Sequence, residues 1–376
     1  MNGMDKKTLG LIGHPYVPIG MGEHLRSTFR SLRSVAARPE ITDIYKLTEP
    51  NPEESAEFSH ACTNRPCDIN LFHINGQEVE QAMAHLTYSQ PWSGYKVIYP
   101  LWELPNYPGE WARLLDRFDE IWAPSRFIQE SIAAACEKPV LHMPLACEVR
   151  LSSFLGRRYF GIPETPYTFL FFFDMRSYAA RKNPGAVIGA FRALLAKHPF
   201  ADAHLVIKVN GAELNPDAFL QLKTELEEMK GYVTIFHRLM ASNEVKNLIR
   251  SCDCFVSLHR SEGYGFGIAE AMFLGKPVIA TAWSGNMDFM PGDASLGVGY
   301  ELVPVAEGAY PHWENQVWAD PDIDQAARYM EQLVEDPAFG YALGRRASSH
   351  IRAHFSYRAA GNRYIVRLDE IQGLLG

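Results

Sequence analysis

Short apolar runs alternate with longer stretches in which apolar residues recur every three or four positions, and this pattern continues along the chain of 376 residues. Such runs are typical of buried strands, and the longer stretches are typical of helices with one apolar face. The alternation predicts parallel α/β layers. The expected strands are Leu9–Gly13, Asp68–Ile74, Tyr95–Tyr99, Glu120–Pro124, Val140–Pro144, Tyr167–Phe173, His204–Asn210, Val233–His237, Cys254–Leu258 and Val278–Thr281. The expected helices are Gly22–Ala37, Gly109–Phe118, Ser125–Cys136, Pro184–Lys197, Pro216–Met229, Ser242–Arg250, Phe266–Leu274 and Tyr357–Leu375.

A change of composition divides this pattern near its middle. The segment Gly156–Pro166, with the sequence GRRYFGIPETP, is rich in Gly and Pro and mixed in charge, and a set of strands and helices lies on each side of it. Such a segment is typical of a junction between domains. We therefore predict two doubly wound domains, residues 1–160 and residues 161–356. Ligands of such sheets bind beyond the carboxyl ends of the strands, so loops that follow strands are the candidate sites.

Composition and charge exclude several classes of protein. With 36 Lys and Arg against 44 Asp and Glu, the formal net charge is −8, which argues against nucleic acid as the main partner. The six cysteines form no Cys-x-x-Cys pair and no set with histidines at zinc spacing, so we expect reduced thiols and no metal. The longest apolar stretch, around Phe169–Phe173, falls far short of the ~20 residues that a membrane helix needs. We therefore expect a cytoplasmic protein.

The segment 254–281 combines a strand, a glycine-rich loop, a short helix and a second strand. Gly263, Gly265 and Gly267 stand where the loop becomes the helix, so a ligand can approach the backbone N–H groups at the positive end of the helix. That environment suits a diphosphate. Glu262 and Glu270 bracket the glycines, and the alternative is that they only cap the helix and face solvent, because glycine loops alone are weak indicators.

The same segment contains SEGYGFGIAEAMFLGKPVIAT, which resembles the E-x7-E segment of retaining GT-B glycosyltransferases, in particular family 4, which uses nucleotide sugars. The acids, the glycines, EAM and GKPVIAT agree with that family in order and spacing. The resemblance implies that Glu262 and the adjacent loop bind the donor sugar, and that Glu270 binds the ribose. The loop residues concerned are Gly263, Gly265, Phe266 and Gly267.

A second segment, FDMRSYAARKNP at residues 173–184, is similar to the part of that family in which an arginine and a lysine hold the donor diphosphate. By spacing, Lys182 matches the lysine and Arg176 the arginine, with Arg181 as a rival for the second role. Two cations in this place would neutralise charge that develops on the leaving diphosphate. Lys208, near the end of a later strand, is a further candidate for contact with the donor, and the alternative is a lysine that only meets solvent.

Two segments of the first half follow strands and resemble parts of the same family. Gly20 and Gly22 are similar to the N-terminal glycine loop that approaches the donor phosphate, and a tight structural turn is the alternative. His73 stands near the place of an acceptor-site histidine at the end of a strand. A shift of one or two residues would place Asn75 there instead, and a buried core histidine is the plainer interpretation.

Aromatic residues accompany an acid in the segment 95–111, YKVIYPLWELPNYPGEW, which looks like a subgroup of these transferases that acts in polysaccharide assembly. Aromatic rings and carboxylates suit the stacking and hydroxyl recognition of sugars, so Trp102 and Glu103 are candidates for binding the acceptor. Three arginines at helical spacing predict one basic face, suited either to solvent or to peripheral association with the inner membrane surface. These are Arg26, Arg30 and Arg33.

The resemblance implies an α/β fold of the GT-B type, with two Rossmann-like domains that face each other across a cleft. Residues 1–160, with a closing helix at 357–376, would bind the acceptor, and residues 161–356 the donor. The implied reaction is retaining transfer of a hexose to a glycan or lipid-linked acceptor in cell-surface polysaccharide or lipopolysaccharide synthesis. No metal or cofactor is expected besides the nucleotide-diphosphate sugar, with GDP-mannose first and UDP- or dTDP-sugars next. A catalytically inactive sugar-nucleotide-binding regulatory module and a GT-B-like sugar-nucleotide epimerase are the alternatives.

Overall fold

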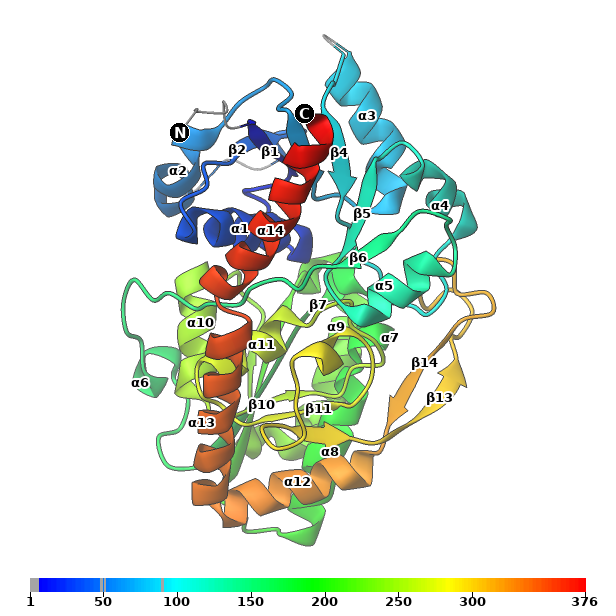
Figure 1. Cartoon of the computed structure of the whole chain (residues 1–376). Helices are drawn as coiled ribbons and strands as arrows, with labels where there is room; N and C mark the ends of the chain where they lie inside the picture. Colours follow the sequence, from blue (N-terminus) through cyan, green and yellow to red (C-terminus); the bar gives the residue numbers. More distant parts are fainter. Residues whose placement is uncertain (1–6, 48–49, 51, 89–90) are drawn as a thin grey trace. The chain divides into compact units, whose positions relative to one another are not determined.

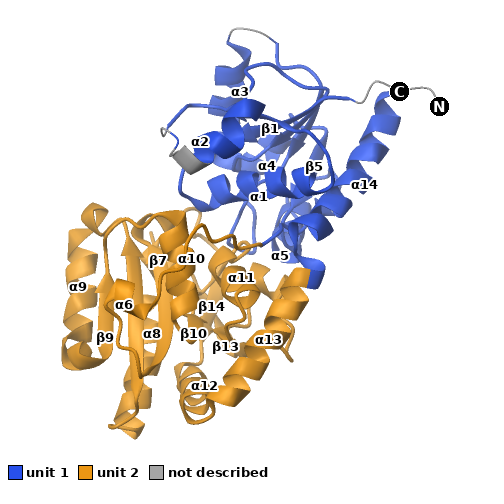
Figure 2. Ribbon diagram, turned by 90° about the vertical axis from the view of Figure 1, so that its left-hand side faces the viewer, with its two compact units in different colours: residues 1–147, 353–376 blue, residues 148–352 orange. Residues whose placement is uncertain are grey.

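The structure, a computed structural model, describes the chain except for residues 1–6, 48, 49, 51, 89 and 90. It divides into two compact units, one of residues 1–147 with 353–376 and the other of residues 148–352 (Figure 2). The division falls ahead of the Gly156–Pro166 segment that we expected at the junction. Arg157 explains the difference, because its guanidinium donates hydrogen bonds to the carbonyl oxygens of Ser251 and Pro166, both at 2.9 Å. The segment is thereby built into the second unit.

The first unit contains a parallel six-stranded sheet in the order β2-β1-β3-β4-β5-β6 (Figure 1). Its strands are β1 (Leu9–Gly13), β2 (Glu40–Asp43), β3 (Ile69–Phe72), β4 (Tyr95–Ile98), β5 (Glu120–Ala123) and β6 (Val140–His142). Its helices are α1 (Gly20–Ser34), α2 (Pro52–Phe58), α3 (Val79–Thr87), α4 (Gly109–Leu115), α5 (Arg126–Ala133) and α14 (Tyr357–Leu375). Strand β2 was not predicted, because a four-residue strand with acidic residues at both ends carries little apolar signal.

The second unit contains another parallel six-stranded sheet, in the order β12-β11-β10-β7-β8-β9, and the antiparallel pair β13-β14. Its strands are β7 (Tyr167–Asp174), β8 (Ala203–Asn210), β9 (Val233–Phe236), β10 (Cys254–Ser257), β11 (Val278–Thr281), β12 (Leu296–Val298), β13 (Tyr300–Pro304) and β14 (Val317–Pro321). Its helices are α6 (Arg157–Phe160), α7 (Ala179–Lys182), α8 (Pro184–Lys197), α9 (Pro216–Leu226), α10 (Ser242–Ser251), α11 (Phe266–Phe273), α12 (Ile323–Glu335) and α13 (Pro337–His354). Every strand and helix predicted from the sequence is present, with small shifts at its ends.

The two faces of the second sheet carry different helices. Phe171 and Ile207 point to one face, where they join a buried core with residues of α8, α9 and α12. Side chains alternate along a strand, so Phe172 points to the opposite face. There its ring packs against Gly267 of α11, where an added Cβ would lie 2.8 Å from the ring. The glycine-rich loop and α11 therefore cover this second face of the sheet, at the carboxyl ends of β7 and β10.

The last helix, α14, is part of the first unit although it ends the chain. The ring of Tyr364 stacks on Trp122 of β5, with centroids 5.6 Å apart and an interplanar angle of 12°. Arg367 forms an ion pair of 2.5 Å with Glu120, which is also on β5. Helix α14 also packs on α1, where Gly361 lies against the carbonyl group of Ser31. None of the described helices combines the length and apolar character needed to cross a membrane.

Candidate functional site

The glycine-rich loop links the carboxyl end of β10 to the first turn of α11. Gly265 begins this turn in a left-handed conformation with φ of +95°, which a residue without a Cβ adopts at little cost. The loop is also tied to the segment after β11, because Glu262 N–H donates to Ser284 Oγ at 2.8 Å and Gly285 N–H donates to the Glu262 carbonyl at 2.9 Å. The first N–H groups of a helix have no partner within the helix, so this end of α11 is suited to an anion.

Glu262 is the centre of a buried charge network at this loop. Its carboxylate forms ion pairs with Lys182 and, at 3.2 Å, with Arg181. Only 9% of the surface of Glu262 is exposed. Burial by itself raises the pKa of Glu262, but the nearby charges of Lys182 and Arg181 outweigh it and lower the pKa to about 2. The network therefore holds one negative and two positive charges at neutral pH.

The two cations reach Glu262 because α7 is fastened beside the loop. Helix α7 is one turn long, and the residues at its two ends, Tyr178 and Asn183, have positive φ angles of 60° and 55°. Hydrogen bonds hold this turn in place: Arg181 donates to the Ser261 carbonyl at 2.7 Å, and the Arg260 N–H donates to the Arg181 carbonyl at 2.8 Å. A non-glycine residue in this conformation is strained and persists only when its surroundings hold it there.

The structure separates the two arginines that the sequence left as rivals. Arg181 joins Lys182 and Glu262, whereas Arg176 forms a two-pronged ion pair with Asp174, with distances of 2.7 and 3.0 Å. Arg176 is half exposed and Arg181 is buried. The spacing to Lys182 in the sequence favoured Arg176. Spacing does not show which of the two side chains turns toward Glu262, and the structure shows that Arg181 does.

Glu270 is buried on α11 and forms an ion pair with Lys246 of α10. The sequence did not indicate Lys246 as a partner of Glu270, because Lys246 lies on a separate helix, and only the tertiary structure shows that this helix packs against α11. The two predicted glutamates thus each meet a basic partner from another element. Glu262 and Glu270 remain the acids nearest the glycines, and their predicted contacts with sugar and ribose remain proposals.

In the first unit, His73 is buried with 0% exposure and lies directly after β3. Its Nδ1 atom shares a hydrogen bond of 2.7 Å with Nδ1 of His24 on α1. Burial lowers the pKa of His73 to about 3, so the ring is neutral at pH 7. Asn75, the alternative to His73, serves a local turn: its side chain accepts from Leu101 N–H at 2.9 Å, and its N–H donates to Glu78.

The other candidates of the first unit have packing roles in the structure. Gly20 begins α1, and a Cβ on Gly22 would lie 2.1 Å from the Val17 carbonyl oxygen, so close packing already requires glycine at that position. Trp102 is buried, its ring lies 5.3 Å from that of Trp111, and its Nε1–H donates to a backbone carbonyl at 3.1 Å. Glu103 beside it is half-buried.

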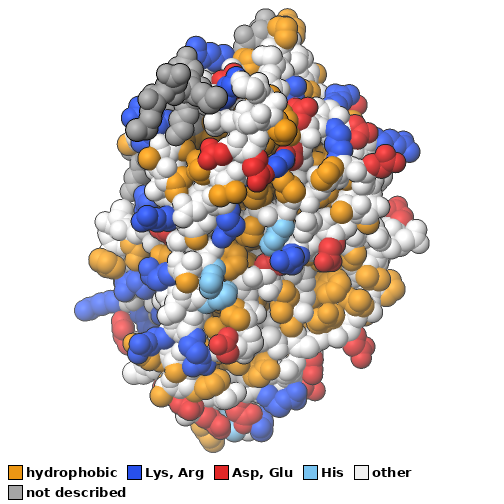
Figure 3. All heavy atoms as spheres, in the orientation of Figure 1, with side chains coloured by type: hydrophobic (Ala, Val, Ile, Leu, Met, Phe, Trp, Pro, Cys, Tyr) orange, Lys and Arg blue, Asp and Glu red, His pale blue; other side chains and the backbone are white. Residues whose placement is uncertain are grey.

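The predicted basic face on α1 is not formed. Arg26 is buried and pairs with Glu23 at 2.9 Å, and Arg30 pairs with Glu57 at 2.8 Å, so Arg33 is the exposed member of the three. The prediction was wrong because helical spacing does not show which neighbours pack over a face. On the face drawn in Figure 3, acidic and basic side chains lie among apolar and neutral ones.

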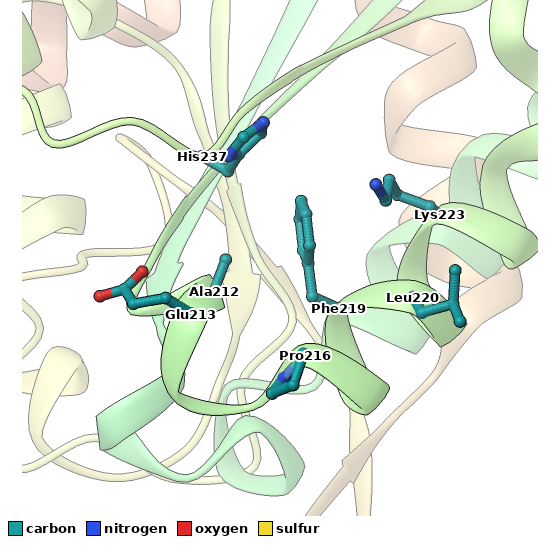
Figure 4. Close-up of a pocket in the computed structure, with 7 residues that line it drawn as sticks. All are labelled: Ala212, Glu213, Pro216, Phe219, Leu220, Lys223 and His237. Atoms are coloured by element: carbon teal, nitrogen blue, oxygen red, sulfur yellow. The ribbon is translucent and has the colours of Figure 1, made fainter.

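Two cavities of the second unit lie apart from the predicted residues. One, of about 400 Å³, lies among residues of α9 and those that follow β8 and β9 (Figure 4). The other, of about 640 Å³, includes Arg157, Asp253 and Lys276. A cluster of His198, Glu331 and Glu335 at the ends of α8 and α12 has ligand atoms within 4.8 Å of one another, but Lys197 pairs with Glu331 at 2.7 Å. Every predicted site residue lies outside the linings of these cavities.

Together, the two parallel sheets and the loop at the carboxyl end of β10 define the GT-B fold. Residues 157–293, which contain the charge network and α11, match the family Glycosyl transferases group 1. Among solved structures, HepE from Anabaena in complex with UDP and glucose is similar, with a TM-score of 0.71 and 13% identity over 97% of this chain and 100% of that chain. Sucrose-phosphate synthase from Thermosynechococcus elongatus has a TM-score of 0.68 and 15% identity over 98% of this chain and 100% of that one.

A curated relative, trehalose synthase from Rubrobacter xylanophilus, is 24% identical over 178 residues. The match includes 46% of this chain and 37% of that protein, so the chain spans little more than a third of the length of this relative. At such identities the structural likeness establishes the fold. The fold is thus of the GT-B type, and residues 157–293 match a family of glycosyl transferases.

Proposed function

We propose that this protein transfers a sugar from a nucleotide-diphosphate sugar to an acceptor. The observation that carries the proposal is the buried network of Glu262, Lys182 and Arg181 beside the first turn of α11. It places two cations and a set of helix N–H groups at the carboxyl end of a parallel sheet, where ligands of such folds bind. The whole network lies within the residues that match Glycosyl transferases group 1.

The chemistry of the proposed reaction matches the charges of this network. When the bond between sugar and diphosphate breaks, negative charge develops on the leaving group, and fixed cations stabilise it. Lys182 and Arg181 would share their charge between Glu262 and the diphosphate, and Glu262 would accept hydrogen bonds from sugar hydroxyl groups. Glu270 would accept from the ribose. Neither glutamate acts as a nucleophile, so the pair is not the dyad of a glycoside hydrolase.

The finer parts of the proposal rest on the resemblance to family 4. They are retention of configuration, a hexose as the transferred sugar, and a glycan or lipid-linked acceptor in surface polysaccharide synthesis. GDP-mannose is our first choice of donor. Uridine diphosphate sugars belong in the same panel, because the similar HepE has been solved with UDP and with UDP-glucose.

A panel of UDP, GDP, dTDP and ADP, each with and without an attached hexose, tests the proposal by thermal shift. A ligand at ~100 times its Kd stabilises the folded state by about 2.7 kcal/mol, which gives a clear rise in Tm. We expect at least one nucleotide to bind, and release of free nucleoside diphosphate from its sugar when an acceptor is supplied. Binding without release would support a regulatory module, and conversion of the donor alone would support an epimerase.

The variants Glu270→Ala and Glu270→Gln sharpen this test. We expect both to weaken binding of the nucleotide about tenfold, since the ribose loses a charged acceptor. Glu270→Gln keeps the shape of the side chain and should fold like the wild type. A similar loss of affinity in both variants would therefore reflect binding and not misfolding. Glu228→Ala, at an exposed position of the same unit, is the control. Unchanged affinity in both Glu270 variants would contradict the ribose assignment.

A further inference from the structure

Lys208 of β8 is buried, and the charge of Asp174 acts on it without forming an ion pair. The residue is 2% exposed, and among the described residues no carboxylate lies within ion-pair distance of its Nζ atom. Burial lowers the pKa of Lys208 to about 8; Asp174 opposes this effect, and Arg238 and Arg176 add to it. Burial of an ammonium group is unfavourable, and a further negative charge close to Lys208 would offset that cost.

The other cations at this edge of the sheet already have acidic partners. Lys182 and Arg181 pair with Glu262, Arg176 pairs with Asp174, and Arg238 pairs with Glu244 at 2.6 Å. Glu213 acts on Arg176 but is not paired with Lys208. Among these cations of the described residues, Lys208 is the one that lacks a carboxylate at ion-pair distance, so a ligand can also meet its charge.

Asn210, the last residue of β8, is oriented by this lysine. Lys208 Nζ donates a hydrogen bond to Asn210 Oδ1. An ammonium group has donors and no acceptor, so the amide oxygen must face the lysine and the amide nitrogen must face away from it. The Asn210 side chain is half-buried, and its Nδ2 group has no hydrogen-bond partner among the described residues. The pair thus presents two N–H donors at the carboxyl end of β8.

The strand register places this pair beside β7, the strand whose Phe172 packs against the first turn of α11. Lys208 is paired with Phe172 and Asn210 with Asp174, so all four side chains lie on the same face of the sheet. Phe172 is the residue whose ring packs against Gly267 in the first turn of α11. Strand β7 therefore lies between β8, which carries the Lys208–Asn210 pair, and β10, whose following loop leads into this turn.

We propose that Asn210, oriented by Lys208, binds a phosphate oxygen of the nucleoside diphosphate. This inference rests on the proposed function and extends the donor site from the loop before α11 to the end of β8. Lys208 is a positioning residue that also supplies positive charge, and Asn210 is the residue in contact. An anionic oxygen fits better than a neutral carbonyl of a base, because the ligand must balance the charge of Lys208.

Two variants test the contact. Asn210→Asp keeps the size of the side chain, forms an ion pair with Lys208 and turns a carboxylate toward the ligand. We expect its Tm to be equal to or above that of the wild type, while its Kd for the best-binding nucleoside diphosphate rises at least tenfold. Lys208→Met removes the charge and frees the amide to rotate, so the same Kd should rise about tenfold. Gln332→Glu, an amide-to-acid change at an exposed position of α12, is the control.

Isothermal titration with the nucleoside diphosphate, the matching nucleoside and inorganic pyrophosphate identifies the group that is bound. In Asn210→Asp, we expect the nucleoside to lose less than twofold in affinity, while pyrophosphate loses as much as the diphosphate. Equal losses for the nucleoside would show that the amide binds the base, and would overturn the assignment to phosphate. Unchanged affinity of both variants would overturn the inference and leave the proposed function standing. A wild type that binds no nucleotide would instead overturn the proposed function.

The pH dependence separates positioning from a merely structural role. Wild-type affinity for the nucleoside diphosphate should fall between pH 7 and pH 9, as Lys208 loses its proton and no longer orients the amide. Asp174, Arg176, Arg238 and Glu213 are the charged groups that act on this region, and the pKa values of Asp174, Arg176 and Arg238 are shifted away from this range. Lys208→Met should show no such fall, and an equal fall in this variant would contradict the role of Lys208.

Discussion

Two buried polar clusters beside parallel strands, one in each unit, respond to burial in opposite ways. In the first, His73 and His24 share one hydrogen bond and both have lowered pKa values, because burial disfavours the charged ring and, for His24, the neighbouring His73 adds to this effect. In the second, Glu262 is similarly buried, yet two cations keep its pKa at about 2. Burial alone therefore removes charge, and burial with opposite charges preserves it. Only the second arrangement holds ions ready to exchange partners with an ionic ligand.

The surroundings of the two histidines explain why both rings are uncharged. One Nδ1 atom must donate and the other accept, so the two neutral rings are in different tautomers. The Nε2 atoms of both rings have no hydrogen-bond partner among the described residues. A proton added to either ring would place a charge against Tyr99 and the second histidine, with centroids 4.2 and 4.7 Å from that of His24.

The largest effect is expected from Lys182→Ala. If the charge network of the second unit is the donor site, this change should lower the rate of nucleoside diphosphate release about 100- to 1000-fold, because the leaving group loses a fixed cation. Steady-state assays with the best donor measure it. The matched control is Lys230→Ala, an exposed lysine paired with Glu227. If the rate falls less than threefold while the fold is intact, the network has a structural role, as the histidine pair does.

Acid should destabilise the first unit as the pH falls below about 6.5. The folded state binds fewer protons at His73 and His24 than the unfolded state, so stability is complete above about pH 6.5 and falls as the pH is lowered toward 3. The loss approaches about 1.4 kcal/mol per pH unit for each ring. Amide hydrogen exchange of β1 and β3 at pH 7 and pH 5 measures it separately from the second unit.

A double variant shows whether the histidines cause this loss. Replacing both partners of a buried hydrogen bond by apolar groups is often nearly neutral, so His24→Leu with His73→Leu should fold at pH 7. Its exchange rates in β1 and β3 should then change little between pH 7 and pH 5 beyond the intrinsic effect. A pH response equal to that of the wild type would assign the acid sensitivity to other groups.

The smallest expected effect is the pH-dependent contribution of Glu262 to the stability of the second unit. Its folded pKa of about 2 lies below the ordinary value of 4.5, so its contribution is complete above about pH 4.5 and is lost as the pH falls toward 2. Exchange in α11 should therefore accelerate below pH 4.5, beyond the change that buried His259, whose pKa is also lowered, causes at higher pH. Glu262→Gln should be less stable at neutral pH, since two buried cations lose their acid, and should lack this acid-dependent step. An identical step in the variant would contradict the assignment.

Much of the fold followed from local pattern. All strands of the two sheets except β2 and β12, and helices such as α8 and α14, were predicted, because apolar periodicity depends on residues close together in the sequence. The loop before α11 was predicted for the same reason, since its glycines and Glu262 are close in sequence. Strand β2 and the β13-β14 pair were missed, because short strands with exposed or polar positions leave no such signal.

Charge pairing was different, because it joins segments that are far apart in the chain. Arg181 and Arg176 have similar sequence surroundings, yet one meets Glu262 and the other Asp174. Lys246 meets Glu270 only because α10 packs on α11.

The sequence by itself determined the alternation of strands and helices, the division into two α/β halves and the glycine loop with its acids. Only the tertiary structure decided which buried groups are neutral and which are charged. The physical reason is that apolar periodicity depends on residues a few positions apart, whereas a pKa and an ion pair depend on distances across the fold.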